Sequence, residues 1–311
     1  MGKKSSLAVP ALVAAVVSWG SIPLFLKHFT TYMDAWTVNG VRYLVGALLL
    51  LPWLRRAADS EAGRSSLWRN AVVPSLVNSV SQAGFALIPY FVPASIMGFG
   101  MRASFLFALA GSLWLLPEER RLVVSRLFWA GGAICIAGII ALFWGSLRQA
   151  MASVPGLLIL FGDAAAWGFY GVSVRKYMRG HPPHRSFAVI SLYTAGILTV
   201  LMFAFGRVSD LANQDASTLG LIVLSAAIGI SLGHVLMYYV LGHLGVIIES
   251  GAEMATPFVT FVGAALIFGE RLSALQWMGG LGVISGCALM ISAHKRHPQP
   301  APGSAPEPLT T

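Results

Sequence analysis

Long apolar runs separated by short polar connections dominate this chain. A membrane-spanning helix needs about 20 mostly apolar residues, and ten runs have roughly that length. The predicted helices cover approximately 8–26, 35–54, 71–91, 94–116, 127–145, 156–174, 187–206, 218–241, 245–268 and 275–293. None of the connections is long enough to form a soluble domain. The pattern therefore predicts an all-α membrane protein, with residues 1–311 forming one transmembrane domain and a disordered, Pro-rich cytoplasmic tail at 295–311.

Composition supports a membrane protein. Hydrophobic residues make up 56% of the chain and charged residues only 11%, whereas a soluble domain carries about 25% charged residues. The net charge of +9 does not indicate a nucleic-acid partner, because the basic residues lie in short connections between apolar runs. Cys135 and Cys287 lie inside apolar runs and are interpreted as small buried hydrophobic residues.

The distribution of Lys and Arg predicts the orientation of the chain. With the N-terminus inside the cell, 15 of these residues lie on the inner side and 4 on the outer side. The remaining two, Arg42 and Arg102, lie within predicted helices. Because positively charged connections stay on the cytoplasmic side, both termini are predicted to be cytoplasmic, in a multi-pass protein of the inner cell membrane.

The chain contains an internal repeat. Two motifs return at a constant offset of 148 residues. They are Trp19-Gly20 with Lys27, which returns as Trp167-Gly168 with Arg175, and Gly131/Gly132/Gly138, which returns as Gly279/Gly280/Gly286. We predict two copies, at about 8–146 and 156–294. Each copy has five helices, an odd number, so the second copy is inverted, as in transporters whose bundles rock around a central cavity.

The order and spacing of these motifs resemble the drug/metabolite transporter superfamily, in particular its EamA-type ten-helix exporters. The residues that carry the resemblance are Trp19-Gly20-Ser21 leading to Lys27, Arg42-Tyr43, Pro257, Gly269-Glu270-Arg271 and the Gly279/Gly280/Gly286 helix. The first copy departs from the family pattern, because it reads Leu116-Pro117-Glu118-Glu119 where the family has Gly-Glu. The resemblance implies efflux of small metabolites, often amino acids or their relatives, driven by an ion gradient or by exchange.

Charged residues inside the apolar runs are candidates for a substrate cavity, because each costs about 2.5–3.5 kcal/mol at mid-membrane. These are Arg42, Arg102, Asp163 and Glu253. Arg102 and Glu253 are repeat counterparts at an offset of 151, so we expect them at equivalent depths. They form a charged cavity wall, a pair that opens and closes as the bundles rock, or a static ion pair that ties two helices together. Two positive and two negative charges would suit a zwitterion such as an amino acid.

Polar and aromatic side chains at helical spacing extend the predicted cavity. Asp163, Trp167 and Tyr170 share one helix face, where the acid could bind an ammonium group beside aromatic rings or could carry a proton. The further candidates are Asn78 and Gln82 in the third run and His234 and Tyr238 in the eighth. Helix packing through hydrogen bonds is the alternative role for each of these groups.

Arg42 has two interpretations: it clamps a substrate carboxylate, or it caps backbone carbonyls at a break in a neighbouring helix. Pro23 and Pro257 are predicted to create such breaks, because proline lacks a backbone donor. Glu249, one turn from the end of its helix, is predicted to be interfacial, at the cytoplasmic mouth.

No motif in the sequence indicates an enzyme, a cofactor, a metal site or a nucleotide fold. We therefore predict a secondary active transporter that exports a small polar or zwitterionic, amino-acid-like metabolite by alternating access. Its predicted partners are a small-molecule substrate, the lipid bilayer and a coupling ion, with a proton as the candidate. Whether two chains form a homodimer stays open. The alternative function is a non-transporting membrane scaffold or a lipid-handling subunit.

Overall fold

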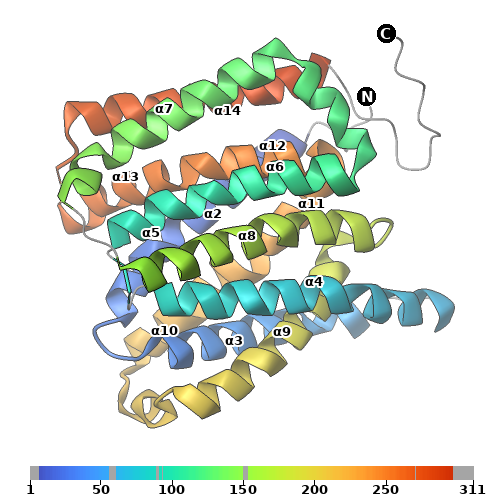
Figure 1. Ribbon diagram of the computed structural model, residues 1–311. Coiled ribbons are helices and arrows are strands. Elements are labelled where there is room, and N and C mark those ends of the chain that lie inside the picture. Colours follow the sequence, from blue (N-terminus) through green and yellow to red (C-terminus); the bar gives the residue numbers. More distant parts are fainter. Residues whose placement is uncertain are drawn as a thin grey trace.

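The computed structural model describes residues 7–55, 61–88, 91–92, 94–149, 153–269 and 271–296, so the predicted tail lies almost entirely outside the described residues. The described part of the chain is helical and contains no strand (Figure 1). The α-helices are α2 (Ala8–Phe29), α3 (Ala35–Arg55), α4 (Glu61–Leu87), α5 (Ala94–Gly100), α6 (Ser104–Leu115), α7 (Arg126–Gln149), α8 (Val154–Tyr177), α9 (Pro183–Phe205), α10 (Ala216–Ser225), α11 (Gly233–Leu244), α12 (Val246–Ala252), α13 (Thr256–Phe268) and α14 (Ala274–Arg296). Short helical segments of other types are η2 (Met101–Ala103), η3 (Pro117–Val124), η4 (Val208–Asn213), η5 (Ala226–Leu232) and η6 (Glu253–Ala255).

Within the described ranges, nine helical segments are long and apolar enough to cross a membrane. They correspond to nine of the ten predicted spans. The other predicted span lies in α4, which has 27 residues and polar first turns. This helix begins at Glu61, ten residues before the predicted start, because its first turns are too polar to appear as an apolar run. A count of ten spans therefore stays a prediction.

Three predicted spans are interrupted helices. A 3₁₀ turn, η2, separates α5 from α6, and a second 3₁₀ turn, η6, separates α12 from α13. A π-helical segment, η5, separates α10 from α11. The predicted break at Pro257 is present, since this proline stands in the first turn of α13, directly after η6. The predicted break at Pro23 is wrong: α2 runs through Pro23 without interruption and packs against α11 and α13, and such neighbouring helices let a membrane helix tolerate proline.

The two halves of the chain exchange their first helices. Helix α2 packs against α11 and α13 of the second half, and its counterpart α8 packs against α4 and α6 of the first half (Figure 1). The repeated glycines make this close approach possible. A β-carbon at Gly20 would lie 2.5 Å from Cβ of Val259, and one at Gly168 would lie 2.6 Å from the Ser104 carbonyl oxygen. Each Trp-Gly pair is thus a packing point against an interrupted helix of the other half.

Helices α7 and α14 lie side by side at one edge of the molecule (Figure 1). A β-carbon at Gly138 would lie 2.6 Å from the Gly279 carbonyl oxygen, and one at Gly286 would lie 2.6 Å from the Gly131 carbonyl oxygen. Small residues let helix backbones meet in this way within membranes. Gly131, Gly138, Gly279 and Gly286 thus serve helix packing, whereas a β-carbon at Gly132 would have no neighbouring atom within 4 Å.

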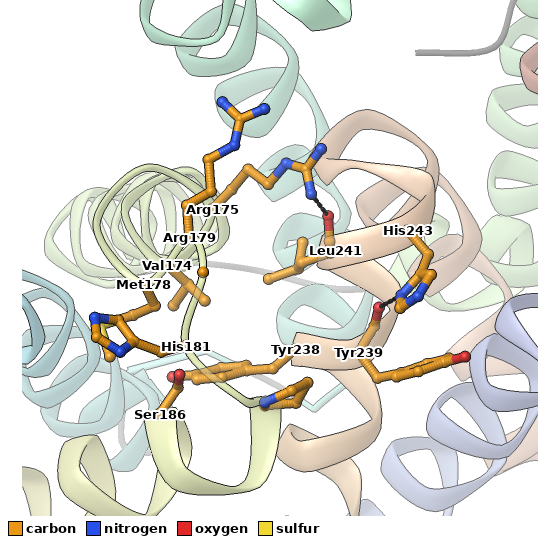
Figure 2. Close-up of a pocket in the computed structure, with 13 residues that line it drawn as sticks. Val174, Arg175, Met178, Arg179, His181, Ser186, Tyr238, Tyr239, Leu241 and His243 are labelled. Carbon is orange, nitrogen blue, oxygen red and sulfur yellow. Dashed lines mark hydrogen bonds between the residues drawn. The ribbon is translucent and has the colours of Figure 1, made fainter. Parts of the chain in front are cut away.

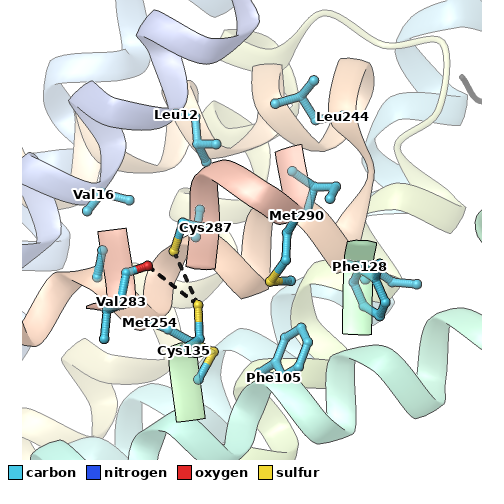
Figure 3. Close-up of a cluster of buried hydrophobic side chains, with 14 of the residues drawn as sticks. Leu12, Val16, Phe105, Phe128, Cys135, Leu244, Met254, Val283, Cys287 and Met290 are labelled. Carbon is cyan, nitrogen blue, oxygen red and sulfur yellow. Dashed lines mark hydrogen bonds between the residues drawn. The ribbon is translucent and has the colours of Figure 1, made fainter. Parts of the chain in front are cut away.

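A buried apolar cluster joins this helix pair to the rest of the bundle (Figure 3). Leu12 of α2, Phe105 of α6 and Met290 of α14 belong to it. The free thiols of Cys135 and Cys287 lie in the cluster with their sulfur atoms 3.8 Å apart. Both cysteines are small buried residues, as the sequence predicts.

Candidate functional site

The two 3₁₀ interruptions meet in the interior of the bundle. Arg102 of η2 donates hydrogen bonds from Nη1 to the backbone carbonyl of Glu253 in η6, at 2.6 Å, and to Oγ1 of Thr256, at 2.7 Å. A break in a helix leaves carbonyl groups without their usual partners. Arg102 therefore stabilises the break in the opposite half of the chain through the backbone. Among the described residues it forms no direct salt bridge with the Glu253 carboxylate.

The Glu253 carboxylate contacts α8 instead. Its Oε2 accepts a hydrogen bond of 3.0 Å from Nε1 of Trp167, while its Oε1 is buried and has no partner among the described residues. Glu249 lies one helical turn earlier and is only 2% exposed. The prediction that Glu249 is interfacial is wrong, because α12 is covered by α6, α8, α11 and α14.

The tryptophan of the first half, Trp19, binds a different kind of acceptor. Its Nε1 donates to the backbone carbonyl of Gly229, at 2.9 Å, in the π-helical segment η5. The neighbouring Ser18 donates to the carbonyl of Ile228, at 2.6 Å. The rings of Trp19 and Trp167 lie edge to face, with centroids 5.6 Å apart. The repeated tryptophans therefore meet inside the molecule.

His234 of α11 lies at the centre of an aromatic cluster. Its ring stacks on Phe187, with centroids 4.3 Å apart. Four further rings surround it at centroid distances from 5.4 to 6.5 Å: Trp19, Tyr43, Trp167 and Tyr170. We call His234, these five rings and Tyr238 the aromatic cluster; it draws on α2, α3, α8, α9 and α11.

Several polar atoms in and beside the aromatic cluster are buried without a hydrogen-bond partner among the described residues. Nδ1 of His234 is 3.0 Å from the Ile230 carbonyl, but Nε2 has no partner. The Tyr43 hydroxyl and Oδ1 of Asn78 are also unpaired, whereas Nδ2 of Asn78 donates to Thr194 at 3.0 Å. Most buried polar groups in proteins are hydrogen-bonded. These atoms are exceptions to that rule, and other exceptions among the described residues include Oγ of Ser112 and Oγ1 of Thr199.

Three predicted site residues lie outside the aromatic cluster. Arg42 is buried and donates from Nε to Ser225, at 3.0 Å, with no acidic partner among the described residues. Asp163 is buried against Gly84 of α4, and neither of its carboxylate oxygens has a hydrogen-bond partner there. Gln82 contributes its backbone carbonyl as acceptor for Asn39, at 3.2 Å, and its side chain is half-buried.

A pocket of about 230 Å³ opens at the predicted cytoplasmic end, between the end of α8, the start of α9 and the end of α11 (Figure 2). Its basic lining residues are Arg175, Arg179, His181 and His243. Tyr238 also lines it, and the Tyr238 hydroxyl is 2.6 Å from the hydroxyl of Tyr170. Both tyrosines belong to the aromatic cluster, so the pocket borders that cluster through Tyr238.

Glu119 is a buried residue that the sequence did not single out as functional. Its two carboxylate oxygens accept hydrogen bonds from the backbone N–H groups of Val246, at 2.7 Å, and Ile247, at 2.9 Å. It therefore clamps the start of α12 to the η3 connection. Burial raises the pKa of Glu119 to about 7, against the lowering effect of those two bonds and of Arg175. The repeat of Glu119-Arg120 at Glu270-Arg271 was the one signal in the sequence; Glu270 lies outside the described residues.

Comparison with known proteins decides the family. The model of the EamA-like transporter family matches residues 6–144 and again residues 154–292. The chain therefore belongs to the EamA-like transporter family. It is an integral, multi-pass protein of the inner membrane and a membrane transporter.

Two relatives of this EamA-like transporter are distant in sequence. A probable amino-acid metabolite efflux pump of Salmonella typhimurium is 22% identical over 282 residues, which cover 87% of this chain and 90% of the relative. The uncharacterized inner membrane transporter YedA of Escherichia coli K12 is 24% identical over 288 residues, or 92% and 90% of the two chains. A solved crystal structure with 17% identity has a TM-score of 0.74 and covers 92% of this chain and 97% of its own, which shows a shared fold.

Proposed function

We propose that this EamA-like transporter exports a small polar or zwitterionic, amino-acid-like metabolite by alternating access. The observation that carries the proposal is the meeting of the two 3₁₀ interruptions beside the aromatic cluster. Transporters commonly bind substrate and ions at interrupted helices near the middle of the membrane, where repeats face each other. The printed name of the Salmonella relative, an amino-acid metabolite efflux pump, supports the choice of substrate class.

The unpaired polar atoms suit an ammonium group. When Nδ1 of neutral His234 donates to the Ile230 carbonyl, its Nε2 is an acceptor. Oδ1 of Asn78 and Oε1 of Glu253 are acceptors as well. Faces of aromatic rings add cation–π attraction, worth about 0.5–2 kcal/mol. We place the substrate's ammonium group among these acceptors, in the aromatic cluster.

Arg42 suits the other end of a zwitterion. Its guanidinium group is buried next to Tyr43 and lacks an acidic partner in the described part of the chain. A guanidinium group can bind a carboxylate through two parallel hydrogen bonds. A zwitterion between Arg42 and Glu253 would bring each buried charge an opposite one, which reduces the cost of burying both in a membrane.

We assign the change between the inward-open and outward-open states to bending of the interrupted helices. Helices α7 and α14 are held together by close backbone contacts and serve as a rigid support. The interruptions in α5–α6, α10–α11 and α12–α13 are the points at which a helix can bend, because they lack the regular α-helical hydrogen bonds.

Counterflow in liposomes tests the proposal. Purified protein is reconstituted, loaded with an excess of each common amino acid in turn, and the uptake of the same radiolabelled amino acid is measured. We expect exchange of at least one of them, and we expect Trp167→Phe, which removes the indole N–H that binds Glu253, to reduce it about tenfold, equivalent to about 1.4 kcal/mol.

Trp114→Phe is the matched control, because Trp114 is 72% exposed on the outside of α6 and should exchange like the wild type. If the folded wild-type protein exchanges none of these compounds, the amino-acid assignment is wrong. If Trp167→Phe exchanges as fast as Trp114→Phe, the aromatic cluster is not the substrate site.

A further inference from the structure

Two acidic side chains lie one helical turn apart in the interrupted helix α12–η6. Glu249 and Glu253 are 2% and 5% exposed, and their spacing of four residues places both side chains on the same face of the helix. Ionised carboxylates have no proton to donate, so two of them can form a hydrogen bond only when one carries a proton. Like charges at this separation also repel strongly where water is excluded.

The charged and titratable groups around this pair do not neutralise it fully. Arg102 faces Glu253 but uses Nη1 for the backbone carbonyl and for Thr256. Glu119 and Tyr170 are the other titratable groups that face Glu249. Glu119 is itself occupied by two backbone N–H groups and faces Arg175.

A count of charges within this group favours one bound proton. Two carboxylates beside one guanidinium group leave a net charge of −1, and a single shared proton makes the group neutral. Neutrality lowers the free energy of burying charged groups in a membrane. A neutral arrangement therefore requires one proton between Glu249 and Glu253.

A separate observation identifies a position for a ligand. Oε1 of Glu253 is buried and has no partner among the described residues, although Oε2 is held by Trp167. Trp167 thus fixes the position of Oε2, and Oε1 is available to a ligand. The same carboxyl group can hold a proton in one state and a substrate ammonium group in the next.

We propose that Glu249 and Glu253 form the proton-binding site that couples export to the proton gradient. This inference rests on the proposed function. A cytoplasmic substrate binds through its ammonium group to Glu253, the O–H bond of the carboxyl pair breaks, and the proton passes to cytoplasmic water. After the site opens outward, a proton from the outside forms the O–H bond again, and the substrate leaves. One proton enters for each ammonium group exported.

The proton site can be tested without a substrate. Infrared spectra of the purified full-length protein, recorded as a function of pH, detect the carbonyl stretch of a protonated carboxylic acid. We expect a protonated carboxyl signal at neutral pH that Glu249→Gln and Glu253→Gln each reduce, beside a separate contribution of Glu119 that Glu119→Gln identifies. Asp210→Asn, which changes a carboxylate paired with Arg207 in the η4 connection, should leave the signal in place. A signal that neither glutamine variant reduces would overturn the proposal.

Coupling is tested in the same liposomes by measuring transport of a radiolabelled amino acid against its own concentration gradient, with and without an imposed pH gradient. The wild type should accumulate a radiolabelled amino acid severalfold more with the gradient, and this ratio should fall to about one in Glu249→Gln while Asp210→Asn keeps it. If the protein shows the infrared signal but its transport does not depend on the pH gradient, the coupling role is wrong. A protein that exchanges no amino acid but has the infrared signal would contradict the proposed function and leave the proton site supported.

Discussion

Trp19 and Trp167 occupy equivalent positions in the two copies, but their indole N–H groups bind chemically different acceptors. Trp19 binds the backbone carbonyl of Gly229, whereas Trp167 binds the carboxylate of Glu253. A backbone carbonyl cannot change its charge, but a carboxylate can. The duplication has preserved the packing of the two tryptophans, and only the second copy places its tryptophan on a group that can titrate.

The 3₁₀ interruptions differ between the two copies in the same way as the tryptophans. Both copies have one, at matched positions, yet the first contains Arg102 and the second contains Glu253. Arg102 stabilises the break in the other copy through the backbone, while the Glu253 side chain faces Glu249 and Trp167. We infer that the first copy supplies support and the second supplies the exchangeable charge. Four changes test this comparison.

The largest effect is expected from Arg102→Met. Methionine has a similar length but no donors, so the Glu253 carbonyl loses its charged partner and the carboxyl pair loses the positive charge facing it. Breaking a buried ionic interaction typically costs about 3–5 kcal/mol. Thermal unfolding in detergent should show a large loss of stability, and counterflow should be abolished. Arg102→Lys, which keeps the charge, should recover part of the stability; equal loss in both variants would mean that the charge has no role.

Gly138→Ala should destabilise the support that both copies share. Its β-carbon would lie 2.6 Å from the Gly279 carbonyl oxygen and would force α7 and α14 apart. Overpacking of this kind costs about 1–3 kcal/mol. Gly132→Ala is the control on the same helix, because no neighbouring atom lies within 4 Å of its added β-carbon. Urea or thermal unfolding should separate the two variants; an equally stable Gly138→Ala would refute close packing here.

Glu119→Gln should loosen the clamp on α12. The amide has one oxygen, so one of the two backbone N–H groups loses its acceptor, at a cost of about 1–3 kcal/mol. Glu118→Gln is the control, since Glu118 forms a salt bridge with the partly exposed Arg179, and such pairs contribute about 0–1 kcal/mol. Melting temperatures at pH 7 should rank Glu119→Gln below Glu118→Gln, and the reverse order would contradict the clamp.

The clamp also predicts a pH dependence. Burial raises the pKa of Glu119 from its ordinary 4.5 to about 7, so the folded protein binds this proton more tightly than the unfolded chain. The resulting stabilisation is fully present below about pH 4.5 and is lost as the pH rises through about 7. The melting temperature of Glu119→Gln should therefore fall less between pH 5 and pH 8 than that of the wild type. Parallel curves would show that Glu119 does not titrate in this range.

The smallest effect is expected from Trp19→Phe. This change removes one hydrogen bond to the Gly229 carbonyl, worth about 1 kcal/mol, and keeps an aromatic ring in place. The melting temperature should fall slightly, and the pH profile of counterflow should keep its shape. Trp167→Phe should shift that profile, because it changes the partner of Glu253. Equal profiles for the two variants would remove the distinction between the copies.

Part of the candidate site could be predicted from the sequence. Charged residues inside apolar runs pointed to Arg102 and Glu253, and the spacing of Trp167 and Tyr170 pointed to one face of α8. The environment of His234 could not be predicted, because Phe187, Trp19 and Tyr43 come from helices that are distant in the sequence. Glu119 was missed for the same reason: its partners, Val246 and Ile247, lie 127 and 128 residues further along the chain.

The sequence by itself determined the membrane class, the approximate helices and the duplication, because each depends on local hydrophobicity or on a repeated spacing. Only the tertiary structure decided that Pro23 lies in a continuous helix, that Glu249 is buried beside Glu253, and that the two tryptophans bind different acceptors. These outcomes depend on which helix covers which face, and the free energy of a buried polar group is set by the partners that such packing brings to it.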